Sequence, residues 1–363
     1  MADLQPVSRD GLVVCACRGH EYTARDALDA ALFRGELDSL WNEFLSDVSA
    51  EKRAKELDTE LDDDAIDEMA EMFRYQHDLI TAEETERWLE KRGLTLEEFS
   101  DYFVRRHWRE ALGENVSAES VDLVSAPPAL RDLFVIELIC ADQLDPLTKQ
   151  LMWRLAARAS NATEDVDPEQ IAAEREQFLD RNKITAEKLQ SWLRQFDRDE
   201  DWLNEMAKTE ITFRKTVDGI LTPEARKKQL ALLRMPLTHF EAELIRVESR
   251  DAAREALLCM REDGMSMEEV AGDARYPFHR ISFRHEDVPE DWQQKFWSVG
   301  AGDLLDALPR GDGFEIYRIM KKSEPELSDA IVQERIDQRL LEQHFSGLVR
   351  EHVEARLQGV DAE

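Results

Sequence analysis

The sequence predicts an α+β protein, in which a mostly α-helical chain carries one small β-containing domain and ends in a long helix. Three observations predict this class. Over most of the 363 residues, apolar side chains recur at three- and four-residue spacing, the period of a helix with one buried face. Residues 236–323 instead alternate short extended runs with helical stretches. The segment from Leu327 to Leu357 is amphipathic, with one apolar side that must pack on something.

The helical part contains an internal repeat. Ile80-Thr-Ala-Glu83 and Trp88 recur as Ile184-Thr-Ala-Glu187 and Trp192, and both pairs are 104 residues apart. Further matches at nearly the same offset are Leu37 with Leu144, Phe73 with Phe178, and Trp108-Arg109 with Phe213-Arg214. Residues 12–112 and 125–220 are therefore interpreted as two copies of one helical unit. Each Thr is expected to cap a helix whose Trp faces the core.

The repeat and the change of pattern give four predicted domains. Residues 1–114 and 125–235 are the two helical repeats, residues 236–323 form the β-containing domain, and residues 324–363 form a C-terminal helix. Asn115 to Pro128, which ends in Ser-Ala-Pro-Pro, reads as the linker between the repeats. The C-terminal helix is expected to pack back on the helical region, and a dimer-forming helix is the alternative.

Charge excludes two classes of partner. The chain has 47 Lys and Arg residues against 79 Asp and Glu residues, which gives a net charge of −32. Nucleic acid and anionic bilayers call for basic patches, so neither is an expected partner. The N-terminus lacks the basic start and apolar core of a secretory signal, and no apolar run approaches the length of a membrane span. The sequence thus predicts a cytoplasmic protein.

No metal or other cofactor is expected. Cys15, Cys17 and His20 lie close together, but no second cluster supplies a fourth ligand, so reduced core cysteines are the better interpretation. The acidic stretch from Glu56 to Glu68 lacks the mid-loop glycine and alternating ligands of a calcium loop, and is interpreted as a solvated loop and first helical turn.

Within residues 236–323 the predicted elements follow a β-α-β-α-β order. They are an extended run (Phe240–Val247), a helix (Arg250–Glu269), a second extended run (Tyr276–Phe283), a short helix (Pro289–Trp297), a turn with Gly311 and Gly313, and a last strand (Phe314–Met320). This order, closing on Gly-Phe-Glu-Ile-Tyr-Arg-Ile, resembles a parvulin-type (PpiC) peptidyl-prolyl isomerase domain. The resemblance implies a pocket that binds the twisted prolyl amide better than the planar one.

The residues expected to perform that chemistry differ from those of parvulins. The resemblance implies one histidine on the first strand and one on the last, whereas this chain has Glu243 and Glu315 there, or Leu244 in place of Glu243 if the register shifts by one. His239 would reach the pocket only in a different register. Two facing carboxylates would need a shared proton or a joining cation, for which Arg246 and Arg318 are candidates. No catalytic residue is therefore assigned.

The part of the resemblance that concerns peptide binding is better preserved. Val288 to Trp297 resembles the family's pocket helix and places Trp292 and Phe296 at its two aromatic positions. The predicted peptide-binding set is Phe283, Trp292, Phe296, Tyr317, Glu243 and Glu315. The alternative is that these aromatic side chains only fill the core of the domain.

The ends of the chain extend the resemblance to SurA-like chaperones. A short strand, a glycine turn at Cys17-Arg-Gly-His-Glu-Tyr-Thr23 and a helix capped by Thr23 and Asp26 resemble the start of their N-terminal domain, whose C-terminal segment returns to it. The expected function is that of a chaperone or adaptor for an extended peptide, of the kind associated with the maturation and export of ribosomal precursor peptides. The alternatives are an active peptidyl-prolyl cis-trans isomerase and a scaffold that binds a maturation enzyme or exporter.

Overall fold

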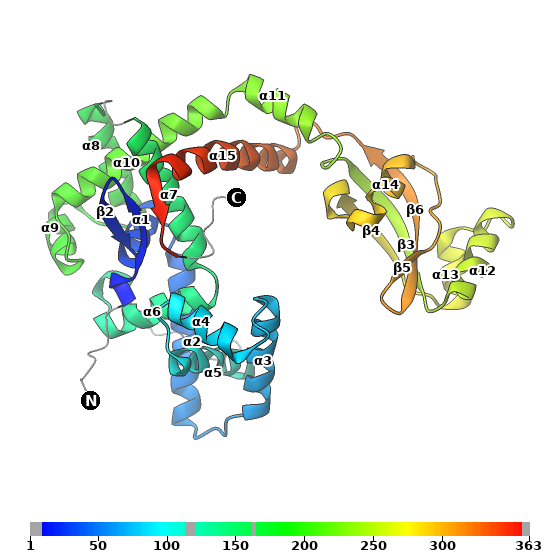
Figure 1. Cartoon of the computed structure of the whole chain (residues 1–363), viewed down its shortest axis with the longest axis horizontal. Helices are drawn as coiled ribbons and strands as arrows, with labels where there is room; N and C mark the ends of the chain where they lie inside the picture. The colour runs from blue at the N-terminus through cyan, green and yellow to red at the C-terminus, as the bar shows by residue number, and fades with distance from the viewer. Residues whose placement is uncertain (1–8, 113–120, 162–164, 358–363) are drawn as a thin grey trace. The chain divides into compact units, whose positions relative to one another are not determined.

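The computed structural model describes residues 9–112, 121–161 and 165–357. The N-terminal residues 1–8 and residues 115–120 of the predicted linker lie outside these ranges. The chain divides into two compact units (Figure 1): unit 1 comprises residues 1–218 and 344–363, and unit 2 comprises residues 219–343. Most of the described chain is helical and two small antiparallel sheets accompany the helices, so the predicted α+β class is confirmed.

Ten helices in two series make up most of unit 1 among the described residues. The first series is α1 (Ala24–Arg34), α2 (Asp38–Glu56), α3 (Asp63–Gln76), α4 (Ala82–Lys91) and α5 (Leu96–Leu112). The second series is α6 (Pro128–Cys140), α7 (Leu144–Ser160), α8 (Pro168–Arg181), α9 (Ala186–Gln195) and α10 (Glu200–Ile220). Thr81 and Thr185 stand at the N-cap positions of α4 and α9, but only the Thr81 side chain makes the predicted cap, by accepting from the Glu84 N–H at 3.2 Å.

Three pairs of corresponding helices end in the same way, whereas α2 is followed by Asp58 with positive φ and α7 by Asn161 with a φ of −108°. A residue with positive φ follows α1, α3 and α4 (Gly35, Asp78 and Gly93) and again α6, α8 and α9 (Asp142, Lys183 and Asp197). Such residues stop a helix by turning the chain into the left-handed region. That the two series are copies of one unit stays a prediction.

The first helix of each series packs against the other series. Phe33 of α1 stacks on Phe178 of α8, with ring centroids 5.1 Å apart. Phe134 of α6 packs on Phe44 of α2 at 5.2 Å. Because the first helix of each series packs into the core of the other series, residues 1–218 belong to one compact unit.

A three-stranded sheet completes unit 1. Its order is β2-β1-β7, with β1 (Val13–Cys17) between β2 (His20–Thr23) and β7 (Val353–Ala355). Arg18 and Gly19 both have positive φ, as a two-residue hairpin turn requires. The predicted C-terminal helix is α15 (Ala330–His352), which ends five residues before the predicted Leu357. The prediction missed β7, because its three residues are a strand only through their pairing with β1.

Unit 2 is built on a four-stranded antiparallel sheet of order β4-β3-β6-β5. Its elements are α11 (Pro223–Leu232), β3 (His239–Val247), α12 (Arg250–Arg261), α13 (Met267–Ala274), β4 (Phe278–Arg284), α14 (Glu290–Ser298), β5 (Leu308–Arg310), β6 (Gly313–Ser323) and the first part of α15. The helix predicted over Arg250–Glu269 is wrong in one respect. It breaks near Gly264, which has positive φ, and Ser266 caps a second helix.

The sheet of unit 2 separates two apolar cores. The aromatic face, which carries Phe240, Leu244 and Tyr317, packs against α14. The opposite face, which carries Ile245 and Ile316, packs against α12 and α13. Gly313 starts β6 where a Cβ atom would lie 2.7 Å from the Val247 carbonyl oxygen, so only glycine fits there without a shift of the backbone. Within the described ranges, no helix is both long and apolar enough to cross a membrane.

Candidate functional site

The structure brings the predicted aromatic residues together on one face of the unit 2 sheet. Trp292 and Phe296 of α14 pack against Tyr317 of β6. Their ring centroids lie 6.5 Å and 5.1 Å from the centroid of the Tyr317 ring. Phe283 of β4 completes the group, 5.4 Å from Phe296. Trp292, Phe296 and Tyr317 are buried, however, and only Phe283 is half-buried. In this arrangement the aromatic rings contact one another and offer little surface to a ligand.

Glu315 lies on the same face and is held in place on two sides. The Tyr317 hydroxyl donates to Glu315 Oε2 at 2.6 Å, and Arg246 Nε donates to Glu315 Oε1 at 2.9 Å. Glu315 is 3% exposed. Burial, together with the hydrogen bond to Glu315, raises the pKa of the Tyr317 phenol. The Arg246 proposed as a joining cation therefore does contact Glu315, although it joins it to no second carboxylate.

Glu243 lies on the other face of the sheet, so the expected pair of facing carboxylates does not form. Glu315 is opposite Arg246 in the β3–β6 register, and Glu243 is three residues before Arg246. An odd separation along a strand places the two side chains on opposite faces. Glu243 instead lies 3.5 Å from Arg280 of β4. Leu244, the alternative position named for the first strand, is the residue opposite Tyr317 on the aromatic face.

Neither His239 nor His285 is placed for isomerase chemistry of the parvulin kind, and His279 of β4, which is opposite Leu244 on the aromatic face, is exposed. His239 pairs with Arg284 at the beginning of β3 and lies on the face opposite Phe240. Sequence reasoning missed His285, which is buried between Phe240 and Trp297. Its Nε2 lies 2.8 Å from the Gln293 carbonyl oxygen, a contact that ties the end of β4 to α14. This is a packing role.

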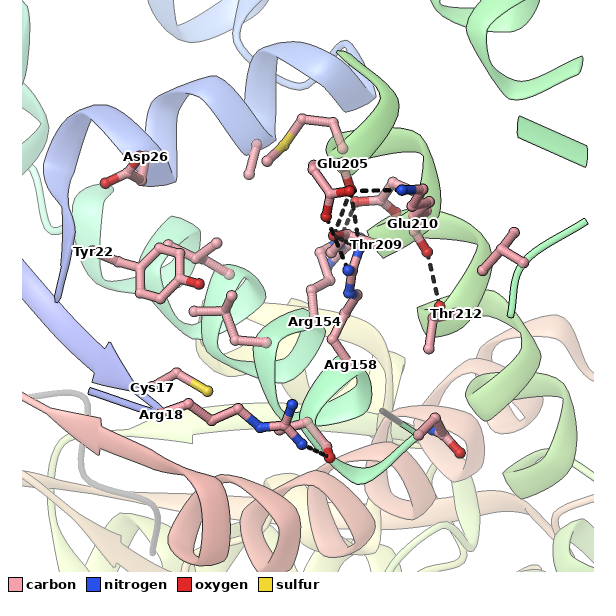
Figure 2. A pocket seen from close by; sticks show the side chains of 18 of the residues that line it. Cys17, Arg18, Tyr22, Asp26, Arg154, Arg158, Glu205, Thr209, Glu210 and Thr212 are labelled. Carbon is pink, nitrogen blue, oxygen red and sulfur yellow. Dashed lines mark hydrogen bonds and ion pairs between the residues drawn. The ribbon is translucent and has the colours of Figure 1, made fainter. Parts of the chain in front are cut away.

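A second candidate site, which sequence reasoning did not find, is a cavity of about 920 Å³ in unit 1. This large cavity lies between the β1–β2 hairpin and helices α1, α7 and α10 (Figure 2). Its apolar lining includes Ala30, Leu151, Leu155, Ile171 and Met206. The sequence contained one signal of this cavity. The charged Arg154 falls three residues after Leu151, at a position where the helical period predicts a buried side chain, and both residues are buried in α7.

The charged side chains of the large cavity are mostly paired with one another. Arg154 Nε donates to Glu210 Oε1 at 2.5 Å, and Arg34 lies 3.8 Å from the same carboxylate. Burial, and then the neighbouring Arg34, lower the pKa of Arg154. Arg158 donates to Glu205 at 2.9 Å, as Figure 2 shows. These pairs neutralise the wall of the cavity in a chain of strongly negative charge.

The hairpin beside the cavity has a free edge. β2 is an outer strand of the three-stranded sheet, and no residue in the described ranges pairs with its outer side. Cys17, His20 and Tyr22 of the hairpin line the cavity. Arg18 at the turn is exposed and donates to the Ala159 carbonyl oxygen at 2.6 Å. The free edge of β2 therefore lies next to the large cavity.

Comparisons with known proteins return similarities of fold only. No family model matches the chain, and no curated protein matches it. Among solved structures, a PrsA peptidylprolyl isomerase from Bacillus cereus is 16% identical, with 59% of this chain and 85% of that chain covered at a TM-score of 0.33. The foldase PrsA from Streptococcus pneumoniae is 17% identical over 59% and 83%, at 0.27. SurA-like chaperones of Campylobacter jejuni are 13% identical over 58% and 82%, at 0.20. At these scores the function has to be argued from the chain's own residues.

Proposed function

We propose that this protein is a chaperone or adaptor that holds an extended peptide and does not isomerise its prolyl bonds. The observation that carries the proposal is the large cavity beside the free edge of β2. A volume of about 920 Å³ is at the upper end of ordinary ligand pockets, which suits several side chains of a peptide better than one small molecule.

The edge and the cavity supply complementary parts of peptide recognition. An extended chain that pairs with an exposed strand gains main-chain hydrogen bonds that do not depend on its sequence. Every second side chain of the added strand would point to the cavity side of the sheet, because side chains alternate along a strand. The apolar lining and the internally paired charges would accept varied side chains, as the client range of a chaperone requires.

The aromatic face of unit 2 supports the non-catalytic part of the proposal. The two positions that the parvulin resemblance assigns to histidine hold Leu244 or Glu243 and Glu315, and Glu315 is already bonded to Tyr317 and Arg246. We retain the predicted peptide-binding role of this face as part of the proposal, through the half-buried Phe283 and the exposed Trp297.

The finer parts of the proposal concern the client and the compartment. A precursor peptide awaiting modification or export is the client we propose, in the cytoplasm. Four cysteines that are all free thiols support a reducing compartment. Recovery of folded modifying enzymes or exporters without any precursor peptide, in a pull-down from the source cells, would favour the scaffold alternative.

Peptide binding is tested by fluorescence anisotropy with a short labelled peptide that is unstructured when free. Thr209 of α10 lines the large cavity, so Thr209→Trp should fill part of it and weaken binding about tenfold, or about 1.4 kcal/mol. Ser191→Trp, on the exposed face of α9 outside the cavity, is the matched control and should bind within about twofold of the original chain. If both variants bind the peptide equally well, the large cavity is not the peptide-binding site. Rapid cis-trans turnover of a proline peptide, abolished by Trp292→Ala, would contradict the non-catalytic part.

A further inference from the structure

A smaller cavity of about 290 Å³ lies between α2 and α5 of the first helical series and α6 of the second. It occupies the place that corresponds to part of the large cavity in the second series. Phe44 and Asp47 of α2 line the small cavity, and their counterparts 107 residues later, Leu151 and Arg154 of α7, line the large one. The position that is cationic in the large cavity is thus anionic in the small one.

The small cavity contains a buried carboxylate whose hydrogen bonding is incomplete. Asp47 is 2% exposed, and its Oδ1 atom has no hydrogen-bond partner among the described residues. Arg109 lies 3.8 Å from that oxygen, which is beyond hydrogen-bond distance. A buried acceptor without a donor is costly, so a ligand that brings an N–H group to this oxygen would relieve the cost.

Other oxygen atoms surround the same space. Tyr102 of α5 also lines the cavity. Glu137, on the opposite helix, accepts at its Oε2 atom from Arg105 Nε at 3.0 Å. Glu43 stands at the rim, 3.8 Å from Arg106. The carboxylates are balanced by arginines, so the unpaired Asp47 Oδ1 atom, and not net charge, favours a ligand here.

Arg106 and Gln143 also line the cavity, and the rest of its wall is apolar. Leu40, Phe44, Phe134 and Leu138 line the cavity around the oxygen atoms. A ligand that fits such a space has a short aliphatic stem, several donors at one end and no acceptor. An ammonium group has three N–H donors and no acceptor, and aromatic rings beside it add a cation–π attraction. The net charge of −32 raises the local concentration of cations near the protein.

We infer that the small cavity binds a primary ammonium group on an aliphatic stem, which a peptide client would supply as a lysine side chain. The lysine source rests on the proposed function, whereas the ammonium chemistry rests only on the cavity. A lysine side chain of a client and a free primary amine carry the same ammonium group, and the experiments below distinguish these two sources.

The first experiment titrates the full chain with n-butylammonium and follows amide chemical shifts near Asp47. Saturable shifts are expected, and Asp47→Asn, which keeps the shape and removes the charge, should weaken binding about tenfold or more, or about 1.4 kcal/mol. Glu97→Gln, at an exposed position of α5 outside the cavity lining, is the matched control, with an expected change of less than about twofold. n-Butanol should bind much more weakly than n-butylammonium.

The inference is overturned if n-butylammonium gives no saturable shift, if n-butanol binds equally, or if folded Asp47→Asn binds like the original chain. If Asp47→Asn does not fold, Tyr102→Phe takes its place, with an expected loss of several-fold, and unchanged binding then overturns the inference. A labelled peptide with one lysine, compared with its Nε-acetyl form, tests the client source. Failure of all peptides with retained butylammonium binding would refute the proposed function and leave the ammonium site standing.

Discussion

Single buried charges in the two helical series have opposite signs at corresponding places. In the first series, Arg105 of α5 pairs with Glu137 of α6 at 3.0 Å, near Asp47 of α2. In the second series, Glu210 of α10 takes the place of the arginine and pairs with Arg154 of α7 and Arg34 of α1. A buried ion pair works with either sign provided that both partners are present, because the cost lies in leaving one charge alone.

A prediction follows for Arg105, whose side chain is fully buried. Arg105→Met should lower the free energy of unfolding by about 3 kcal/mol, since it leaves Glu137 buried without its cation. Adding Glu137→Gln should recover most of that loss, because the second change removes the isolated charge. Urea denaturation followed by circular dichroism measures both variants. A double variant no more stable than Arg105→Met would contradict this account of the pair.

At the scale of elements, the sequence was sufficient to predict a helix where the signals for that helix lie within one segment. The helices that begin after Thr23 and Thr81 follow from caps and periodicity that lie within one segment. β7 and β5 could not be predicted, since three-residue strands exist only through distant partners. The large cavity was missed for the same reason, because its walls come from both helical series. The unit 2 aromatic residues were found, but whether they face a groove or a core depends on α14 packing that no spacing reveals.

The strand β7 gives an element-scale prediction. Arg356 donates its backbone N–H to Val14, and alternation along an antiparallel ladder makes Glu354 and Ala16 the next hydrogen-bonded pair. Glu354→Pro removes that bond, at a cost of about 1 kcal/mol or more, and should speed proteolysis of the C-terminal strand. Ala355→Pro is the control, since the N–H of Ala355 points away from β1. Equal cleavage rates for the two variants would show that β7 is not held as described.

At the scale of the whole molecule, carboxyl groups affect the stability of the fold both on the surface and in the interior. Burial is the main cause that raises the pKa of Asp29 to about 6, that of Asp47 to about 6 and that of Glu137 to about 7. Their arginine neighbours oppose this shift without cancelling it. All three residues belong to unit 1. The surface adds mutual repulsion, which weakens as carboxylates are protonated.

Stability should therefore increase in mild acid. A carboxyl group whose pKa is higher in the folded chain binds its proton more tightly when folded, so protonation favours folding as pH falls through the folded value. The gain accumulates from about pH 8 to about pH 4, where the unfolded chain takes up the same protons. A shift of about 2 units corresponds to at most about 3 kcal/mol per group. We expect the Tm of unit 1 to rise from pH 8 to pH 5.5, measured by calorimetry at low protein concentration. High salt should screen the surface repulsion and leave most of the rise, whereas Asp29→Asn should reduce its slope. A Tm that is flat or falls over this range would mean that these buried carboxyl groups do not govern the stability of unit 1.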